Sequence, residues 1–213
     1  MPIYKELLYR PDGRRRALLN TIVIALNILV FLVLEVLGDT TDGQFMYLCG
    51  ASYPPEIVEQ QQYYRLFLSM FMHFGAAHLM NNMLVLFFLG DNLERAVGKI
   101  RYLLIYLGSG FCGGLASSYV MYAKREYAVG AGASGAIFGV FGALFFLVLY
   151  NRGRMEDLST KRLGIFILLT LYSGFTSPGV DNYAHVGGLI SGFLLALLIG
   201  RRKRKGKNSP YED

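Results

Sequence analysis

The chain has 213 residues, of which 54% are hydrophobic and only 17% are charged, and its net charge is +6. Soluble globular proteins carry roughly 25% charged residues. Together with a mean hydropathy of +0.38, this composition excludes an ordinary soluble domain and favours an all-α, multipass membrane protein that forms one compact domain.

Six apolar stretches are candidates for membrane spans, because a helix needs about 20 mostly apolar residues to cross a bilayer. They cover approximately residues 17–37, 77–95, 102–122, 133–150, 163–176 and 184–200. The first follows a basic start, as a signal peptide does. However, it is longer than a signal h-region of roughly 7–15 residues, and no small-residue cleavage site follows it. We therefore interpret it as a retained span.

Basic residues fall mainly on one side of these spans. The N-terminal segment, the second–third link, the fourth–fifth link and the tail hold 18 of the 21, whereas the other side has Arg65, Lys124 and Arg125. This asymmetry predicts that both termini are cytoplasmic. We divide the chain into a cytoplasmic segment (1–16), a membrane domain (17–200) and a basic cytoplasmic tail (201–213). The net charge then needs no nucleic acid partner, and the tail either flanks the last span or contacts anionic lipids.

The long outer connection, residues 38–65, mixes acidic residues and prolines with many aromatic residues. Aromatic side chains are enriched at the headgroup level, so we expect this connection to lie partly in the membrane interface. The two cysteines, Cys49 and Cys112, fall in this loop and in a span. Two cysteines so placed form neither a disulfide framework nor a metal cluster, and we interpret them as small apolar residues that fill space in the packing.

Small residues recur four apart in three spans, a spacing that lets membrane helices approach closely. The pairs are Gly110 with Gly114, Gly135 with Gly139, and Gly188 with Gly192. Two of these pairs directly follow Ser134 and His185, which begin the fourth and sixth spans. Both spans run from outside to inside, so packing of their glycine faces would bring the two polar side chains together just below the outer surface.

These residue types are suited to nucleophilic catalysis. A serine hydroxyl needs a neighbouring base, and His185 can serve because imidazole titrates near neutral pH. The oxyanion formed on attack needs donors. The Ser134 amide at a helix N-terminus is one candidate, and His78 and Asn82, four apart on one helix face, are two more. We therefore predict a site shared by three spans.

The residues around this site favour a Ser–His dyad over a triad. Residues 132–136 do not satisfy the G-x-S-x-G elbow of soluble hydrolases, because Ala136 replaces its last glycine. Asp181, in the loop four residues before His185, is a weaker candidate for orienting the ring. We expect His73 to be a structural hydrogen-bond donor to the first outer loop.

At these motifs the chain resembles the rhomboid intramembrane serine proteases, over about residues 17–200. Residues 132–135 resemble the family's GxSG, residues 78–82 its HxxxN, and residues 184–192 its AHxxGxxxG. The resemblance implies a six-helix bundle in which Ser134 is the nucleophile and His185 the general base. It also implies that His78, Asn82 and the Ser134 amide form the oxyanion hole. Tyr64 and Arg65 resemble the family's Trp-Arg pair.

One departure is Phe138, where family members often have a tyrosine stacked on the catalytic histidine. The resemblance implies cleavage of single-pass membrane proteins near the outer end of their span, with lateral entry past the fifth span and the 175–183 loop. It implies no metal, nucleotide or other cofactor and no obligate partner. The six spans match the basic bacterial form of the family, so we expect an integral protein of a bacterial cell membrane.

Three alternatives remain. A transporter or proton channel would use His78, His185, Asn82 and Glu35 as a relay, although a conducting path needs polar groups at several depths. A catalytically inactive relative would bind membrane clients without cleaving them. A metal or haem site on the three histidines lacks soft ligands and a suitable spacing.

Overall fold

The computed structural model describes residues 13, 16–155, 158–177 and 179–199. The fold is mostly helical, as predicted. Its elements are α2 (Leu18–Leu37), α3 (Gly43–Leu48), α4 (Pro54–Val58), α5 (Tyr64–Ser69), α6 (Gly75–Val85), η1 (Leu86–Gly90), α7 (Asp91–Val97), α8 (Lys99–Lys124), α9 (Ser134–Tyr150), β1 (Arg154–Met155), β2 (Leu158–Ser159), α10 (Thr160–Thr176) and α11 (Asn182–Ile199). The tail 201–213 and nearly all of segment 1–16 lie outside the described residues.

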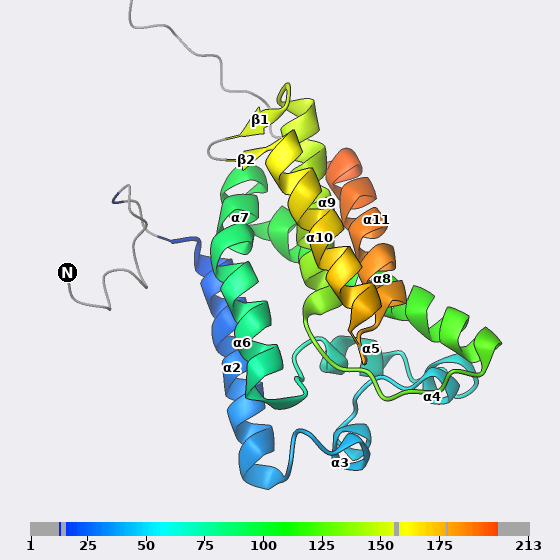
Figure 1. Cartoon of the computed structure of the whole chain (residues 1–213). Coiled ribbons are helices and arrows are strands. Elements are labelled where there is room, and N and C mark those ends of the chain that lie inside the picture. Colours follow the sequence, from blue (N-terminus) through cyan, green and yellow to red (C-terminus); the bar gives the residue numbers. More distant parts are fainter. Residues whose placement is uncertain (1–12, 14–15, 156–157, 178, 200–213) are drawn as a thin grey trace, which may run out of the picture.

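A helix occupies each of the six predicted spans, and α6, η1 and α7 follow one another without a break in the second. Within the described ranges, α2, α8 and α11 are long and apolar enough to cross a membrane, and α9 is a shorter apolar helix. Figure 1 shows the start of α2, α7 and the β1–β2 hairpin at one end of the bundle, with α3, α4 and α5 at the other. This arrangement is compatible with six spans. The number of spans and the orientation of the termini stay predictions.

Helix α9 lies at the centre of the bundle, and nearly all of its side chains are buried. It packs most extensively on α11 through the predicted glycine faces. A Cβ added to Gly188 would lie 2.1 Å from the carbonyl oxygen of Gly135, and one added to Gly192 would lie 2.0 Å from that of Gly139. Only glycine permits backbones this close, so the predicted pairing of these two faces is confirmed.

The third glycine pair has different neighbours. A Cβ on Gly110 would lie 2.4 Å from Met70 Cε, and one on Gly114 would lie 3.1 Å from a methyl group of Leu66. These glycines therefore make room for side chains of the α5 segment. Gly113, between them, instead faces the backbone of α11.

The outer connection is folded around Arg65. This buried side chain donates to the carbonyl oxygens of Tyr47 and Ala51 at 2.9 and 3.0 Å, and to Gln62 Oε1 at 2.8 Å. Its guanidinium also lies 4.8 Å from the centre of the Tyr47 ring. A planar, permanently charged group with several donors is suited to joining such backbone carbonyls, so Arg65 fixes the position of α3 relative to α5.

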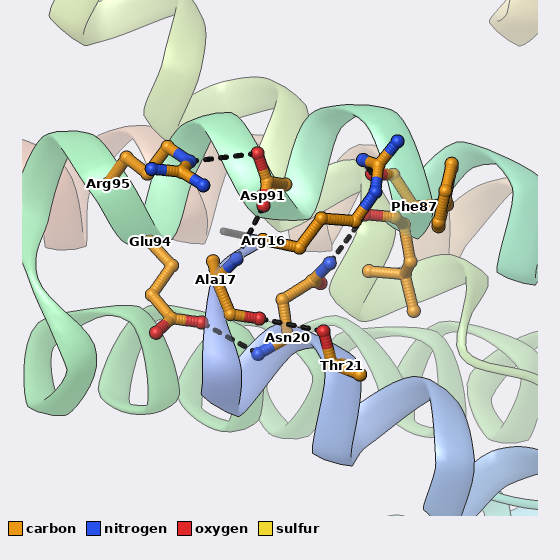
Figure 2. A network of polar contacts seen from close by, with 9 residues as sticks. Arg16, Ala17, Asn20, Thr21, Phe87, Asp91, Glu94 and Arg95 are labelled. Carbon is orange, nitrogen blue, oxygen red and sulfur yellow. Dashed lines mark hydrogen bonds and ion pairs between the residues drawn. The ribbon is translucent and has the colours of Figure 1, made fainter. Parts of the chain in front are cut away.

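At the opposite end, polar residues in and just before α2 contact the π-helical turn η1 (Figure 2). Asn20 Nδ2 donates to the carbonyl oxygen of Leu86 at 2.9 Å, and Arg16 donates to that of Phe87 at 3.2 Å. A π-helical turn changes the usual carbonyl pairing, and here Asn20 of α2 and Arg16, which precedes α2, supply partners for two of its carbonyls. Gly90, the last residue of this turn, lies close to the Asn20 side chain. Only the absence of a side chain permits this approach, since a Cβ on Gly90 would lie 2.0 Å from Asn20 Oδ1.

Two buried carboxylates of α7 complete this junction. Asp91 accepts from the Ala17 amide at 2.6 Å, and Glu94 accepts from the Asn20 amide at 2.7 Å. The first amides of a helix lack intrahelical partners, and α2 has no side-chain cap of its own. Helix α7 therefore caps α2 and fixes it against the continuous helical segment formed by α6, η1 and α7.

Candidate active site

A cavity of about 740 Å³ lies among α6, α8, α9, α10, α11 and the outer loops. The four side chains predicted for the site, Ser134, His185, His78 and Asn82, all line it. Ser134 and His185 belong to the first turns of α9 and α11, and the other two residues belong to α6. Residues separated by more than a hundred positions in the sequence therefore share one cavity.

The loop before Ser134 is held by backbone hydrogen bonds to the first outer loop and α5. Ser52 and Gly130 exchange amide–carbonyl bonds of 2.9 and 2.8 Å, and the Gly132 amide donates to the Ser69 carbonyl at 2.9 Å. Gly132 has φ 138°, a conformation that glycine tolerates and other residues rarely adopt. These bonds fix the peptide that leads into α9 and thereby the start of that helix.

His73 takes part in the same support, in a way that corrects the sequence-based expectation. Its side chain is fully buried, and its Nε2 accepts a 3.4 Å hydrogen bond from the Ala133 amide. Burial, with a smaller contribution from the nearby His78 ring, lowers the pKa of His73 to about 3. The imidazole is therefore neutral and can accept. We expected a donor to the first outer loop, whereas the ring is an acceptor for the residue before Ser134.

The His185 ring is positioned by a stacking contact. Phe138, one turn after Ser134 on α9, lies parallel to it with ring centroids 4.2 Å apart and an interplanar angle of 18°. The aromatic face expected at this position is thus present. The His185 ring is buried, and its Nδ1 has no hydrogen-bond partner among the residues that the structure describes.

Among the described residues, the Asp181 side chain makes no hydrogen bond to that ring. Its carboxylate accepts from Ser117 Oγ, with 2.7 Å to each oxygen, and from the Ala184 amide at 2.9 Å. Asp181 is therefore the N-cap of α11, a role that carboxylates commonly take. This geometry favours the predicted dyad over a triad.

His78 and Asn82 lie beside the glycine loop. A Cβ on Gly132 would lie 2.7 Å from His78 Cε1 and 3.7 Å from Asn82 Nδ2. Asn82 Nδ2 is buried and has no hydrogen-bond partner within the described part of the chain. Buried donors are rarely left unpaired in native proteins, so this amide is available for an acceptor that enters the cavity.

In the described part of the chain, no hydrogen bond joins the Ser134 hydroxyl to His185. Hydrogen bonds between catalytic groups are often long in unliganded enzymes and tighten when substrate binds. Ser134 and His185 both line the cavity, and the residues beside them are in contact, since a Cβ on Gly135 would lie 3.6 Å from the Ala184 carbonyl oxygen.

Several lining residues were missed from the sequence. Ser117 and Asn81 both line the cavity, as does Thr170 of α10. Asn81 carried a signal, since two adjacent asparagines are unusual in an apolar span. Ser117 carried no such signal, because serine is common where membrane helices pack against one another.

Comparison with known proteins identifies relatives. Residues 60–202 match the family model described as Rhomboid domain. The chain is 38% identical over 180 residues to Rhomboid protease GluP of Bacillus subtilis (strain 168). The aligned region covers 84% of this chain and 34% of that protein. It is 31% identical over 217 residues to RHOMBOID-like protein 7 of Arabidopsis thaliana, covering 89% of this chain and 68% of that protein.

A further relative, RHOMBOID-like protein 1 of Arabidopsis thaliana, is 37% identical over 162 residues, covering 72% of this chain and 40% of that protein. The chain thus spans about a third of the length of GluP. The matched regions include both helices that carry Ser134 and His185. Since the family model covers well over half of the residues, the chain belongs to the rhomboid family.

Proposed function

We propose that this protein is an intramembrane serine endopeptidase with Ser134 as nucleophile and His185 as general base. The observation that carries the proposal is that the first turns of α9 and α11 present these two side chains to one cavity. Membership of a family whose relatives include a protein named Rhomboid protease supports it.

In the proposed reaction, Ser134 Oγ attacks the carbonyl carbon of the scissile peptide bond while its proton passes to the His185 ring. The tetrahedral intermediate then collapses, and His185 returns the proton to the leaving amine nitrogen. Water, deprotonated by the same ring, hydrolyses the acyl-serine and regenerates the hydroxyl. The parallel face of Phe138 holds the ring in one plane through these transfers.

The oxyanion of the intermediate needs fixed donors, each of which contributes about 2.7–4 kcal/mol to its stabilisation. We assign this role to the Ser134 amide, Asn82 and His78. The unpartnered Asn82 Nδ2 supports the assignment, because it is a buried donor beside the loop that carries the nucleophile.

We further propose that the substrates are single-pass transmembrane proteins, cut near the outer membrane face. Thr170 of α10 lines the cavity, which supports lateral entry past this helix and the 175–183 loop. The protein would be an integral, six-span protein of a bacterial cell membrane, in contact with its lipids and with both termini cytoplasmic. The proposal needs no cofactor, nucleic acid or obligate partner.

Covalent labelling tests the nucleophile directly. A serine-directed fluorophosphonate should label the detergent-solubilised protein, and the label should disappear in Ser134→Ala and in His185→Ala. Thr21→Ala is a matched control, because among the described residues this hydroxyl bonds only to the Ala17 carbonyl, and it does not line the cavity. Full labelling of the Ser134→Ala variant would remove the assignment.

Two alternatives make different predictions. A proton relay through Glu35 would need this carboxylate near the histidines, but it accepts from Thr40 at the end of α2 and does not line the cavity. A client-binding protein without activity would resist labelling in the wild-type chain, so the same experiment separates it from the protease.

A further inference from the structure

A polar contact joins the start of α11 to α8 on one side of the cavity. Ser117 Oγ lies 2.7 Å from each carboxylate oxygen of Asp181, and Ser117 is almost completely buried. Asp181, which directly precedes α11, also accepts a hydrogen bond from the Ala184 amide of that helix at 2.9 Å. One carboxylate therefore ties α8 to the residue immediately before His185.

The backbones of the two helices are closest one turn away from this contact. A Cβ on Gly113 would lie 2.7 Å from the Ala184 carbonyl oxygen and 2.9 Å from the Gly188 nitrogen. Gly113 and Ser117 are four residues apart and therefore lie on the same face of α8. The glycine sets how near α11 can come, and the Ser117–Asp181 contact sets where its first turn lies along α8.

That first turn carries His185. The His185 amide itself donates to the Asp181 carbonyl oxygen at 3.2 Å, so both the backbone and the side chain of Asp181 hold the turn. The ring receives no bond from this carboxylate, and its Nδ1 is unpartnered. The contacts of Asp181 therefore reach the ring through the backbone of α11.

We propose that Asp181 is a positioning residue that, through Ser117, fixes the placement of His185 in the cavity. The inference rests on the proposed role of His185 as general base. A misplacement of about 1 Å at a reacting group can reduce turnover by roughly 100-fold. Loss of the contact should therefore lower kcat and leave substrate affinity nearly unchanged.

The test compares Asp181→Ala, Asp181→Asn and Ser117→Ala in the full chain, purified in detergent and assayed with a fluorogenic transmembrane peptide. We expect Asp181→Ala to lower kcat at least tenfold with KM within about twofold. Asp181→Asn should recover most of the activity, since asparagine caps a helix about as well as aspartate. Ser117→Ala should lower kcat, and the double variant should be no worse than Asp181→Ala, because both changes remove one contact.

Asp42 provides the matched control. It caps α3 by accepting from the Gln44 and Phe45 amides, and it does not line the cavity. Asp42→Ala should leave kcat unchanged. The rate of fluorophosphonate labelling at Ser134 should fall in parallel with kcat in the Asp181 variants, and thermal unfolding of each variant separates misplacement from loss of the fold.

Three results would overturn the inference. Unchanged kcat in Asp181→Ala shows that the contact does not position His185. An equal loss in Asp181→Asn shows that the negative charge is required, and a loss confined to KM shows contact with substrate. Failure of the wild-type protein to be labelled or to cleave would instead contradict the proposed function, so the two failures are distinguishable.

Discussion

Phe138 and His185 come from different helices, yet their rings stack with centroids 4.2 Å apart and only 18° between their planes. Phe138 lies four residues after Ser134, on the same face of α9. The helix that presents the hydroxyl therefore also presents the surface against which the imidazole lies. The stacking couples the orientation of the ring to the position of the serine.

Replacing this ring should reduce turnover without removing the reaction. Aromatic pairs contribute about 0.5–1.5 kcal/mol beyond the area that they bury, so we expect Phe138→Leu to lower kcat by up to about tenfold. Phe138→Tyr keeps the stacked face and should retain most of the activity. Steady-state kinetics on a transmembrane peptide measure both variants, and wild-type turnover in Phe138→Leu would show that the stacking has no role in positioning His185.

Loss of one proposed oxyanion donor should have a larger effect. We expect Asn82→Ala to lower kcat by roughly 10²-fold or less, as for removal of a single donor, with KM and thermal stability nearly unchanged. Asn151→Ala is the control, because this amide bonds within α9 at the opposite end of the bundle. An unchanged kcat in Asn82→Ala would show that the side chain is only structural.

The α9–α11 contact should be intolerant of a single methyl group. In Gly192→Ala the new Cβ would lie 2.0 Å from the Gly139 carbonyl oxygen. Because that oxygen belongs to the backbone, the helices must separate, and overpacking of this kind typically costs about 1–3 kcal/mol of unfolding free energy.

The unfolding midpoint in detergent, followed by circular dichroism, measures this loss. Gly43→Ala on α3 serves as the control, because a Cβ there meets nothing within 4 Å. A midpoint of Gly192→Ala equal to that of the wild type would contradict the packing described for α9 and α11.

Removal of Asn20 should destabilise the opposite end of the bundle. Its amide donates to the Leu86 carbonyl, and its Oδ1 accepts from the Tyr102 hydroxyl at 2.7 Å. Asn20→Ala leaves both buried groups unpaired, and each such group costs about 1–3 kcal/mol in water-soluble proteins. Interhelical hydrogen bonds in membranes contribute less, about 0.6 kcal/mol on average.

We therefore expect the unfolding free energy of Asn20→Ala to fall by about 1–2 kcal/mol, with Ser134 labelling retained. Thr21→Ala, on the same helix, should have little effect, since its hydroxyl bonds only to the Ala17 carbonyl of its own segment. Equal stability of the two variants would show that the junction of α2 with η1 contributes nothing.

Local patterns were enough to predict the helices and to single out the four polar residues that line the cavity. Apolar length identifies a span, and a histidine or serine in such a span stands out. The short helices of the outer connection were missed, although Asp42 and Pro54 carry the usual signals of a helix start. The acceptor role of His73 could not be predicted, because it depends on Ala133, 60 residues away.

The π-helical turn η1 changes the directions in which side chains point along the continuous segment formed by α6, η1 and α7. One extra residue in a turn rotates everything after it by about 100° relative to a regular α-helix. His78 and Asn82 precede the turn, whereas Asp91 and Glu94 follow it. The extra residue thus lets one continuous helical segment direct His78 and Asn82 into the cavity at one end and the carboxylates that cap α2 toward that helix at the other. Deleting any one residue between 86 and 90 would put those two faces out of phase.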